Sequence, residues 1–150
     1  MKKKWVMIFS LLGIMLAVGA CSSVQNPAAA KEVLLEVTID EFMAEKNISR
    51  QVEVARGGTL TVLLGSNPST GFQWSEQAEI TDRAVLMPGV HRYVAPEENG
   101  GTPLPGAAGK EEWTFYALDK GTTDVSMDYS RSWEGGEKDE WTFKLTVVVR

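Results

Sequence analysis

Hydrophobic and polar residues alternate in short runs along most of the chain after about residue 33. Apolar side chains occupy every second position in four of these runs, at 35–40, 60–64, 123–129 and 141–149. A period of two is the signature of a β-strand with one face toward a core and the other toward water. We therefore expect each of these runs to be a half-buried strand.

Weaker runs lie between them, at 51–55, 72–76 and 84–95, and the last is interrupted by Pro88-Gly89, which predicts a bulge or break. Two copies of Glu-Trp-Thr-Phe, at 112–115 and 140–143, are expected to be core strands with Trp and Phe inward and Glu and Thr outward. No stretch has convincing helical periodicity. The pattern favours an all-β domain, an immunoglobulin-like β-sandwich of about seven to eight strands. A closed barrel is the alternative.

The N-terminus has a different pattern. Three lysines precede an apolar run from Trp5 to Ala20 that is short for a membrane span and typical of a signal peptide. The run ends in Val18-Gly19-Ala20-Cys21, which resembles a bacterial lipoprotein signal with Cys21 as the acylated residue. We predict a signal peptide at 1–20, a lipidated Cys and tether at 21–32, and the folded domain at 33–150. The resemblance implies a lipid-anchored protein of the cell envelope, on the outer membrane if the cell is Gram-negative.

Charge and composition limit the kinds of partner that the protein can bind. Loss of the three lysines of the signal peptide would lower the formal net charge from −5 to −8. An acidic chain argues against nucleic acid as a partner and leaves the lipid as the source of membrane attachment. We expect a monomer.

Catalytic chemistry is also disfavoured. The chain has one Cys, whose thiol would carry the lipid, and one His, His91, to which we assign no role. No spacing singles out a carboxylate pair, and no phosphate-binding loop is present. We predict that the protein is not an enzyme and uses neither a cofactor nor a metal.

A rigid loop is predicted between two of the strands. Pro68 fixes its own φ, and Gly71 permits a positive φ that other residues resist. Phe72 and Trp74 follow on one face and can anchor the loop in the core. Two further loops, 106–110 and 131–136, also precede an aromatic-x-aromatic strand start. Trp133 has no alternation around it to bury it, so an exposed contact role is as reasonable as packing.

In this order the three loops resemble those of the chagasin family of cysteine-protease inhibitors. The family's first motif, Asn-Pro-Thr-Thr-Gly plus an aromatic, differs here only at Ser69. Ala108 departs from its Gly-x-Gly-Gly motif, and Ser132 replaces the proline of Arg-Pro-Trp. The resemblance implies protease-binding residues in three loops: Asn67, Pro68, Ser69, Thr70, Gly71 and Phe72; Gly106, Ala107, Ala108 and Gly109; Arg131, Ser132 and Trp133.

The resemblance implies a function as well. It implies a reversible inhibitor of papain-like cysteine proteases, whose loops enter and flank the active-site cleft, with Thr70 and Gly71 near the catalytic centre and Trp133 on an aromatic of the enzyme. Preorganised loops lower the entropy cost of such binding. The alternative is a lipid-anchored module that binds or assembles envelope components without inhibiting a protease.

Overall fold

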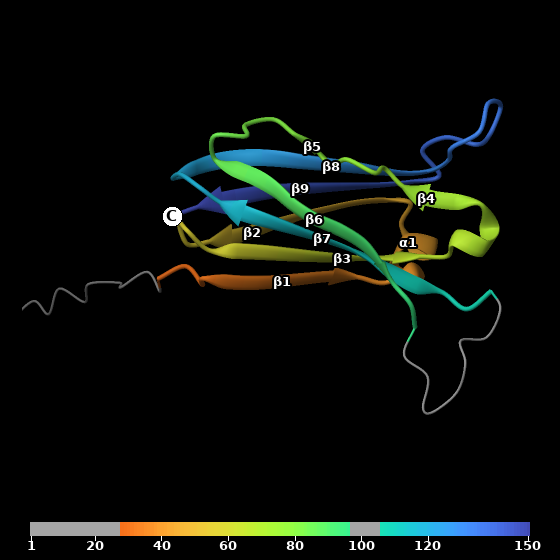
Figure 1. Cartoon of the computed structure of the whole chain (residues 1–150), viewed down its shortest axis with the longest axis horizontal. Coiled ribbons are helices and arrows are strands. Elements are labelled where there is room, and N and C mark those ends of the chain that lie inside the picture. The colour runs from red at the N-terminus through yellow and green to blue at the C-terminus, as the bar shows by residue number, and fades with distance from the viewer. Residues whose placement is uncertain (1–27, 97–105) are drawn as a thin grey trace, which may run out of the picture.

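The computed structural model describes residues 28–96 and 106–150, which form two β-sheets packed face to face (Figure 1). One sheet has the order β1-β3-β7-β6, and the other has the order β2-β9-β8-β4, with β5 also pairing with β8. The strands are β1 (Glu32–Val37), β2 (Asn47–Val54), β3 (Thr59–Ser66), β4 (Phe72–Trp74), β5 (Glu79–Ile80), β6 (Leu86–Val94), β7 (Gly109–Ala117), β8 (Gly121–Arg131) and β9 (Trp141–Val149). The predicted immunoglobulin-like sandwich is confirmed.

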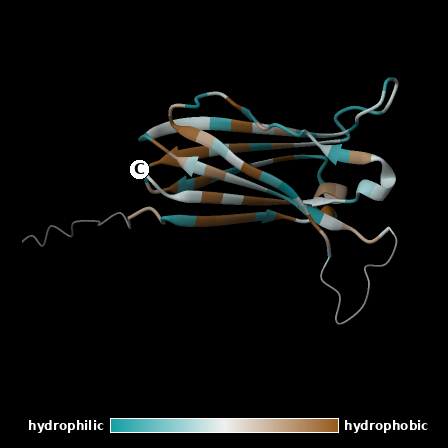
Figure 2. Ribbon diagram, in the orientation of Figure 1, coloured by the Kyte–Doolittle hydropathy of each residue, from teal (hydrophilic) through white to brown (hydrophobic). Residues whose placement is uncertain are grey.

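Most strand pairs are antiparallel, but β1 runs parallel to β3 and β2 runs parallel to β9. The predicted alternation holds in the central strands, where Leu60, Val62 and Leu64 of β3 are fully buried. Figure 2 shows the same alternation as brown and paler bands along the ribbons. The facing apolar rows of the two sheets form one core.

The run 35–40 is not a strand throughout, which corrects the prediction. β1 ends at Val37, and a short helix, α1, spans Ile39–Ala44. Thr38 caps this helix: its Oγ1 accepts from the backbone N–H of Glu41, and the Glu41 carboxylate accepts from the backbone N–H of Thr38. This capping box is readable in the sequence as Thr-x-x-Glu, and it stops the strand. The helix buries Phe42 against the rings of Trp74 and Trp141.

Two further predictions about the strands have mixed outcomes. The break near Pro88-Gly89 is confirmed, since the β6–β7 register shifts between Pro88 and His91. Trp141 is only partly buried, unlike Phe143, Leu145, Val147 and Val149 on the same face of β9. Trp141 is the first residue of β9 and lines a cavity there, which leaves part of its side chain exposed.

Some predictions concern residues outside the described ranges. The signal peptide at 1–20, Cys21 and most of the tether at 21–32 belong to this group, as does the larger part of the loop before Gly106. Within 28–96 and 106–150, no helix has the length and hydrophobicity needed to cross a membrane.

Candidate functional site

The first loop, residues 67–71, is held in shape by its own hydrogen bonds. Asn67 Oδ1 accepts from the backbone N–H of Ser69 at 3.3 Å and from Ser69 Oγ at 2.6 Å, and Thr70 Oγ1 donates to Asn67 O at 2.7 Å. Pro68–Thr70 form one 3-10 turn, which Gly71 ends at φ +81°. The predicted positive φ at Gly71 is therefore confirmed, and the loop presents a stiff polar tip.

Two aromatic residues fasten this loop to the sandwich. The buried Tyr129 of β8 accepts a hydrogen bond at its Oη from the backbone N–H of Asn67, at 2.9 Å. Its ring stacks on Phe72 with 5.5 Å between centroids. Phe72 is thus buried beneath the loop, where it anchors the exposed residues Pro68, Ser69 and Thr70.

The described part of the second loop, Gly106–Gly109, lies against the first. Asn67 Nδ2 donates to Gly106 O at 3.0 Å. Gly109 begins β7 opposite Ser66, the last residue of β3, so the two loops leave neighbouring strand ends. A Cβ at Gly109 would lie 2.4 Å from Tyr93 Oη and 2.5 Å from Val94 O, so only glycine fits here.

The third loop, 131–136, contacts the first through Trp133. A Cβ on Gly71 would lie 2.5 Å from Trp133 Cη2, so the indole rests directly on the glycine. The Arg131 guanidinium lies between two rings, 4.4 Å from the Phe72 centroid and 5.5 Å from the Trp133 centroid. Trp133 is still 51% exposed. The residues predicted from the three loops therefore gather at one end of the sandwich.

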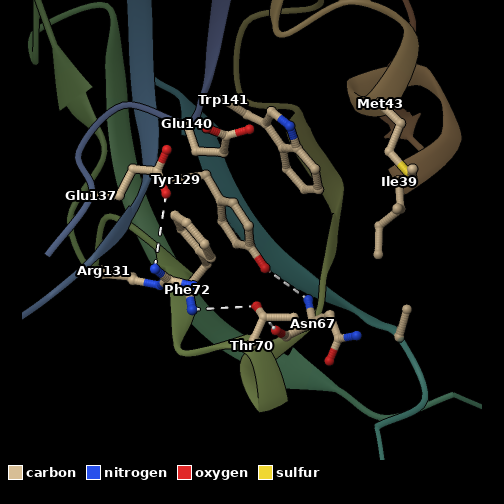
Figure 3. Close-up of a pocket in the computed structure, with 11 residues that line it drawn as sticks. Ile39, Met43, Asn67, Thr70, Phe72, Tyr129, Arg131, Glu137, Glu140 and Trp141 are labelled. Carbon is tan, nitrogen blue, oxygen red and sulfur yellow. Dashed lines mark hydrogen bonds and ion pairs between the residues drawn. The ribbon is translucent and has the colours of Figure 1, made fainter.

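A cavity of about 440 Å³ opens beside these loops (Figure 3). Thr70, Ala108 and Arg131 line it from the three loops, and Ile39 and Met43 line it from α1. Tyr129, Phe72 and Trp141 supply aromatic surface. Helix α1, which was not predicted from the sequence, thus forms one wall of this cavity.

Charged groups around the third loop are coupled to one another. The Lys46 ammonium hydrogen-bonds Glu140 at 2.7 Å and holds the pKa of that carboxyl below its usual range. Burial raises the pKa of Asp128, and the carboxylates of Asp139 and Glu79 raise it further. The acidic character predicted from composition therefore extends to the strand beneath the third loop.

Several supporting residues were not predicted from the sequence. Lys138 Nζ donates to Arg131 O and also to Trp133 O at 3.4 Å, which ties the third loop together. His91 Nε2 lies 2.8 Å from Glu111 Oε2, and Glu111 is buried. The signal for Glu111 was present in the sequence, since it shares the inward parity of Trp113 and Phe115. In the described parts of the chain, no three metal-binding side chains gather in one place.

Known proteins resemble this chain in sequence and in structure. A family described as chagasin family peptidase inhibitor I42 matches residues 53–147. Amoebiasin-2 of Entamoeba histolytica is 27% identical over 109 residues, covering 73% of this chain and 85% of the relative. Chagasin of Trypanosoma cruzi is 29% identical over 99 residues, covering 59% of this chain and 86% of the relative.

A solved structure has the same fold. The crystal structure of a cysteine protease inhibitor from Entamoeba histolytica superposes with a TM-score of 0.60 at 23% identity, covering 79% of this chain and 97% of that one. The family match includes the first and third loops and the described second loop. The family consists of inhibitors, which confirms the prediction that the protein is not an enzyme. This chain belongs to the chagasin family of peptidase inhibitors.

Proposed function

We propose that the protein reversibly inhibits papain-like cysteine proteases by placing its three loops in and around the active-site cleft. The observation that carries the proposal is the convergence of the loops: Asn67 bonds to Gly106, and Gly71 lies under Trp133. Family membership and the fold shared with a cysteine protease inhibitor support the choice of target class.

The geometry suits a cleft blocker because its shape is fixed before binding. The first loop presents Pro68, Ser69 and Thr70 to solvent on a tip that its own hydrogen bonds hold. A rigid loop loses little conformational entropy on association and does not adapt to the extended geometry that cleavage requires. Trp133 beside the tip adds an exposed aromatic surface of the kind that dominates binding energy at interfaces.

Trp133→Ala tests the contact directly. We expect the change to weaken inhibition by about 2 kcal/mol or more, because a half-exposed indole at the loop end would be lost from the interface. The free energy of unfolding should change little. Tyr116→Ala is the matched control, since Tyr116 is 40% exposed on the outer face of β7. Titration of papain activity with the three proteins measures the effect, and equal inhibition by all of them would contradict the role of Trp133.

A competition experiment separates inhibition from the alternative, an envelope-binding module. An inhibitor that enters the cleft should bind free papain and fail to bind papain whose active-site cysteine carries a covalent blocking group. A serine protease serves as the control for specificity. Equal binding to free and blocked papain would place the contact outside the cleft, and an absence of inhibition at micromolar concentration would favour the envelope-binding module.

We also propose that Cys21 carries the lipid anchor that keeps the inhibitor at the cell envelope. The supporting geometry is the position of the first described strand. The backbone O of Ala30 accepts from the N–H of Ala55, and β1 begins beside Thr59 at the start of β3. The first loop follows the other end of β3, so the chain enters the sandwich at the end opposite the loops (Figure 1). An anchor there would leave the loops facing away from the membrane.

Cys21→Ser should release the protein from the membrane. A single acyl chain holds a protein only marginally, whereas two or more hold it stably, so loss of multiple acylation should move the protein to the soluble fraction. Fractionation followed by immunoblotting measures the distribution, with Ser22→Ala as the control. A folded and processed Cys21→Ser protein that stays wholly in the membrane pellet would contradict the lipid anchor.

A further inference from the structure

The carboxylate of Glu111 lies inside the sandwich beneath the first loop. Only 5% of this residue is exposed, so its charge is removed from water. A buried carboxylate is costly unless hydrogen bonds and a positive charge compensate for it. The contacts that surround Glu111 therefore indicate what the residue does.

One oxygen of Glu111 joins the two residues that flank the first loop. Oε1 accepts from Ser66 Oγ at 2.8 Å and from the backbone N–H of Trp74 at 3.3 Å. Ser66 ends β3, and Trp74 ends β4. The same carboxylate thus bridges Ser66 and Trp74, on either side of the first loop, and fixes the distance between them.

The other oxygen of Glu111 faces His91, and each ring nitrogen of His91 lies beside an oxygen atom that can accept a hydrogen bond. Nε2 lies 2.8 Å from Glu111 Oε2, and Nδ1 lies 3.1 Å from the backbone carbonyl oxygen of Glu76. The ring is stacked on Trp113, with 4.3 Å between centroids and an interplanar angle of 7°, so its plane is fixed. A carbonyl oxygen can only accept, which requires a proton on Nδ1.

This geometry sets the number of protons in the pair. A neutral imidazole with its proton on Nδ1 would turn the Nε2 lone pair toward a carboxylate oxygen. Both contacts are satisfied together only when the pair holds one more proton, either as an imidazolium or on the Glu111 carboxyl. Loss of that proton breaks the contact to Glu111 or the contact to Glu76, which follows β4 by two residues.

We propose that Glu111 and His91 position the inhibitory loop and make its rigidity depend on the proton that they share. Ser66 and Trp74, at the two ends of the first loop, bond to Oε1 whether or not the pair holds the extra proton. As the pH rises, the pair loses either the contact that holds Oε2 of the same carboxylate or the contact that holds Glu76 after β4, so the support of the loop loosens. The loop belongs to the proposed inhibitory site, so inhibition should weaken with increasing pH. This inference rests on the proposed function for its effect on inhibition, but not for its effect on the loop.

Other charged and titratable groups lie near the pair. Arg92 and Tyr93 of β6 and Glu112 of β7 adjoin the pair in sequence, and Glu76 and Arg83 approach from the segments between β4 and β6. The Arg92 guanidinium is held by Glu112, with two contacts of 3.1 Å. In the described structure, the contacts to the Glu111 carboxylate come from His91, Ser66 and Trp74.

Glu111→Gln removes the need for the extra proton while it keeps the contacts. The amide oxygen of Gln can accept from Ser66 and Trp74, and its NH₂ group can donate to the Nε2 of a neutral His91. The matched control is Glu112→Gln, which makes the same chemical change one position along β7, on the outward face. A merely structural role for Glu111 would not alter a pH profile in this way.

The test uses the full chain between pH 5 and 8, the range in which imidazole side chains generally change charge. NMR of the labelled protein reports the protons on the His91 nitrogens and the Glu111 carboxyl, together with the amide resonance of Gly71. In the wild type and in Glu112→Gln, the pair and the Gly71 amide should titrate with one midpoint. In Glu111→Gln, the Gly71 amide should stay constant.

Inhibition of papain supplies the second measurement. We expect the inhibition constant to rise about tenfold from pH 5 to pH 8 for the wild type and less than about threefold for Glu111→Gln. A wild-type pair that lacks the extra proton at pH 5, or a Gly71 amide that does not follow the pair, overturns the proposal even if the variant fails to fold. If the Gly71 amide titrates but papain is never inhibited, the proposed function fails and the positioning of the loop stands.

Discussion

Replacing Gly71 with valine should weaken inhibition by about a hundredfold, equivalent to about 3 kcal/mol of binding free energy. Two independent costs act at this position. Gly71 has a φ of +81°, which a β-branched residue strongly disfavours. A Cβ would also lie 2.5 Å from Trp133 Cη2 and 2.8 Å from Cζ3, so the indole must move. The substitution therefore distorts the first and third loops together.

A matched control separates the loop effect from backbone strain. Gly57 has a similar φ of +70° in the turn between β2 and β3, at the opposite end of the sandwich, and a Cβ there would lie 3.4 Å from the Lys31 ammonium, an ordinary contact. Gly57→Val should lose stability and keep inhibition, whereas Gly71→Val should lose inhibition and keep its β-rich circular dichroism. If Gly71→Val inhibits papain as strongly as the parent does, the tip of the first loop is not part of the contact.

Individual strands could be predicted from the sequence because the alternation of apolar and polar residues is visible within each segment. The runs at 60–64 and 123–129 each place one face in the core, and a period of two is visible in a few residues. The pairing of β1 with β3 and of β2 with β9 is not local, because it depends on how distant segments meet. The helix at Ile39–Ala44 was missed because six residues are too few for a helical period, although its capping box could have been recognised.

The residues of the candidate site also fall into two groups, those that the local sequence indicates and those that depend on tertiary contacts. The loop residues could be predicted because proline, glycine and a tryptophan outside any alternating run are recognisable in the sequence. The structure places these residues together. Their supports were missed because each depends on a tertiary contact. Tyr129 bonds to Asn67 across 62 positions, and Ser66 bonds to Glu111 across 45. Lys138 Nζ donates to the backbone oxygens of Arg131 and Trp133 in the third loop, a contact that the sequence alone does not indicate.

Phe143→Ala should destabilise the domain by about 3–5 kcal/mol, the usual cost of truncating a fully buried phenylalanine. The side chain is 0% exposed, and β9 lies between β2 and β8, with Ile48 and Met127 beside Phe143 in the register. The neighbouring strands constrain collapse around the missing ring, so a cavity remains. Trp141→Ala should cost less, because Trp141 is partly buried and its loss removes stacking with Tyr129 and Phe42 at the edge of the core.

Chemical denaturation followed by circular dichroism measures these free energies of unfolding. Lys144→Ala is the matched control, since Lys144 follows Phe143 on the same strand and points to solvent. Its denaturation midpoint should stay close to that of the parent, and that of Phe143→Ala should fall clearly. An unchanged midpoint for Phe143→Ala would mean that this face of β9 does not pack into the core. In that case the last strand would have the opposite parity, and Tyr129, which lies beside Trp141 in the β8–β9 register, would not be buried where it can hold Asn67.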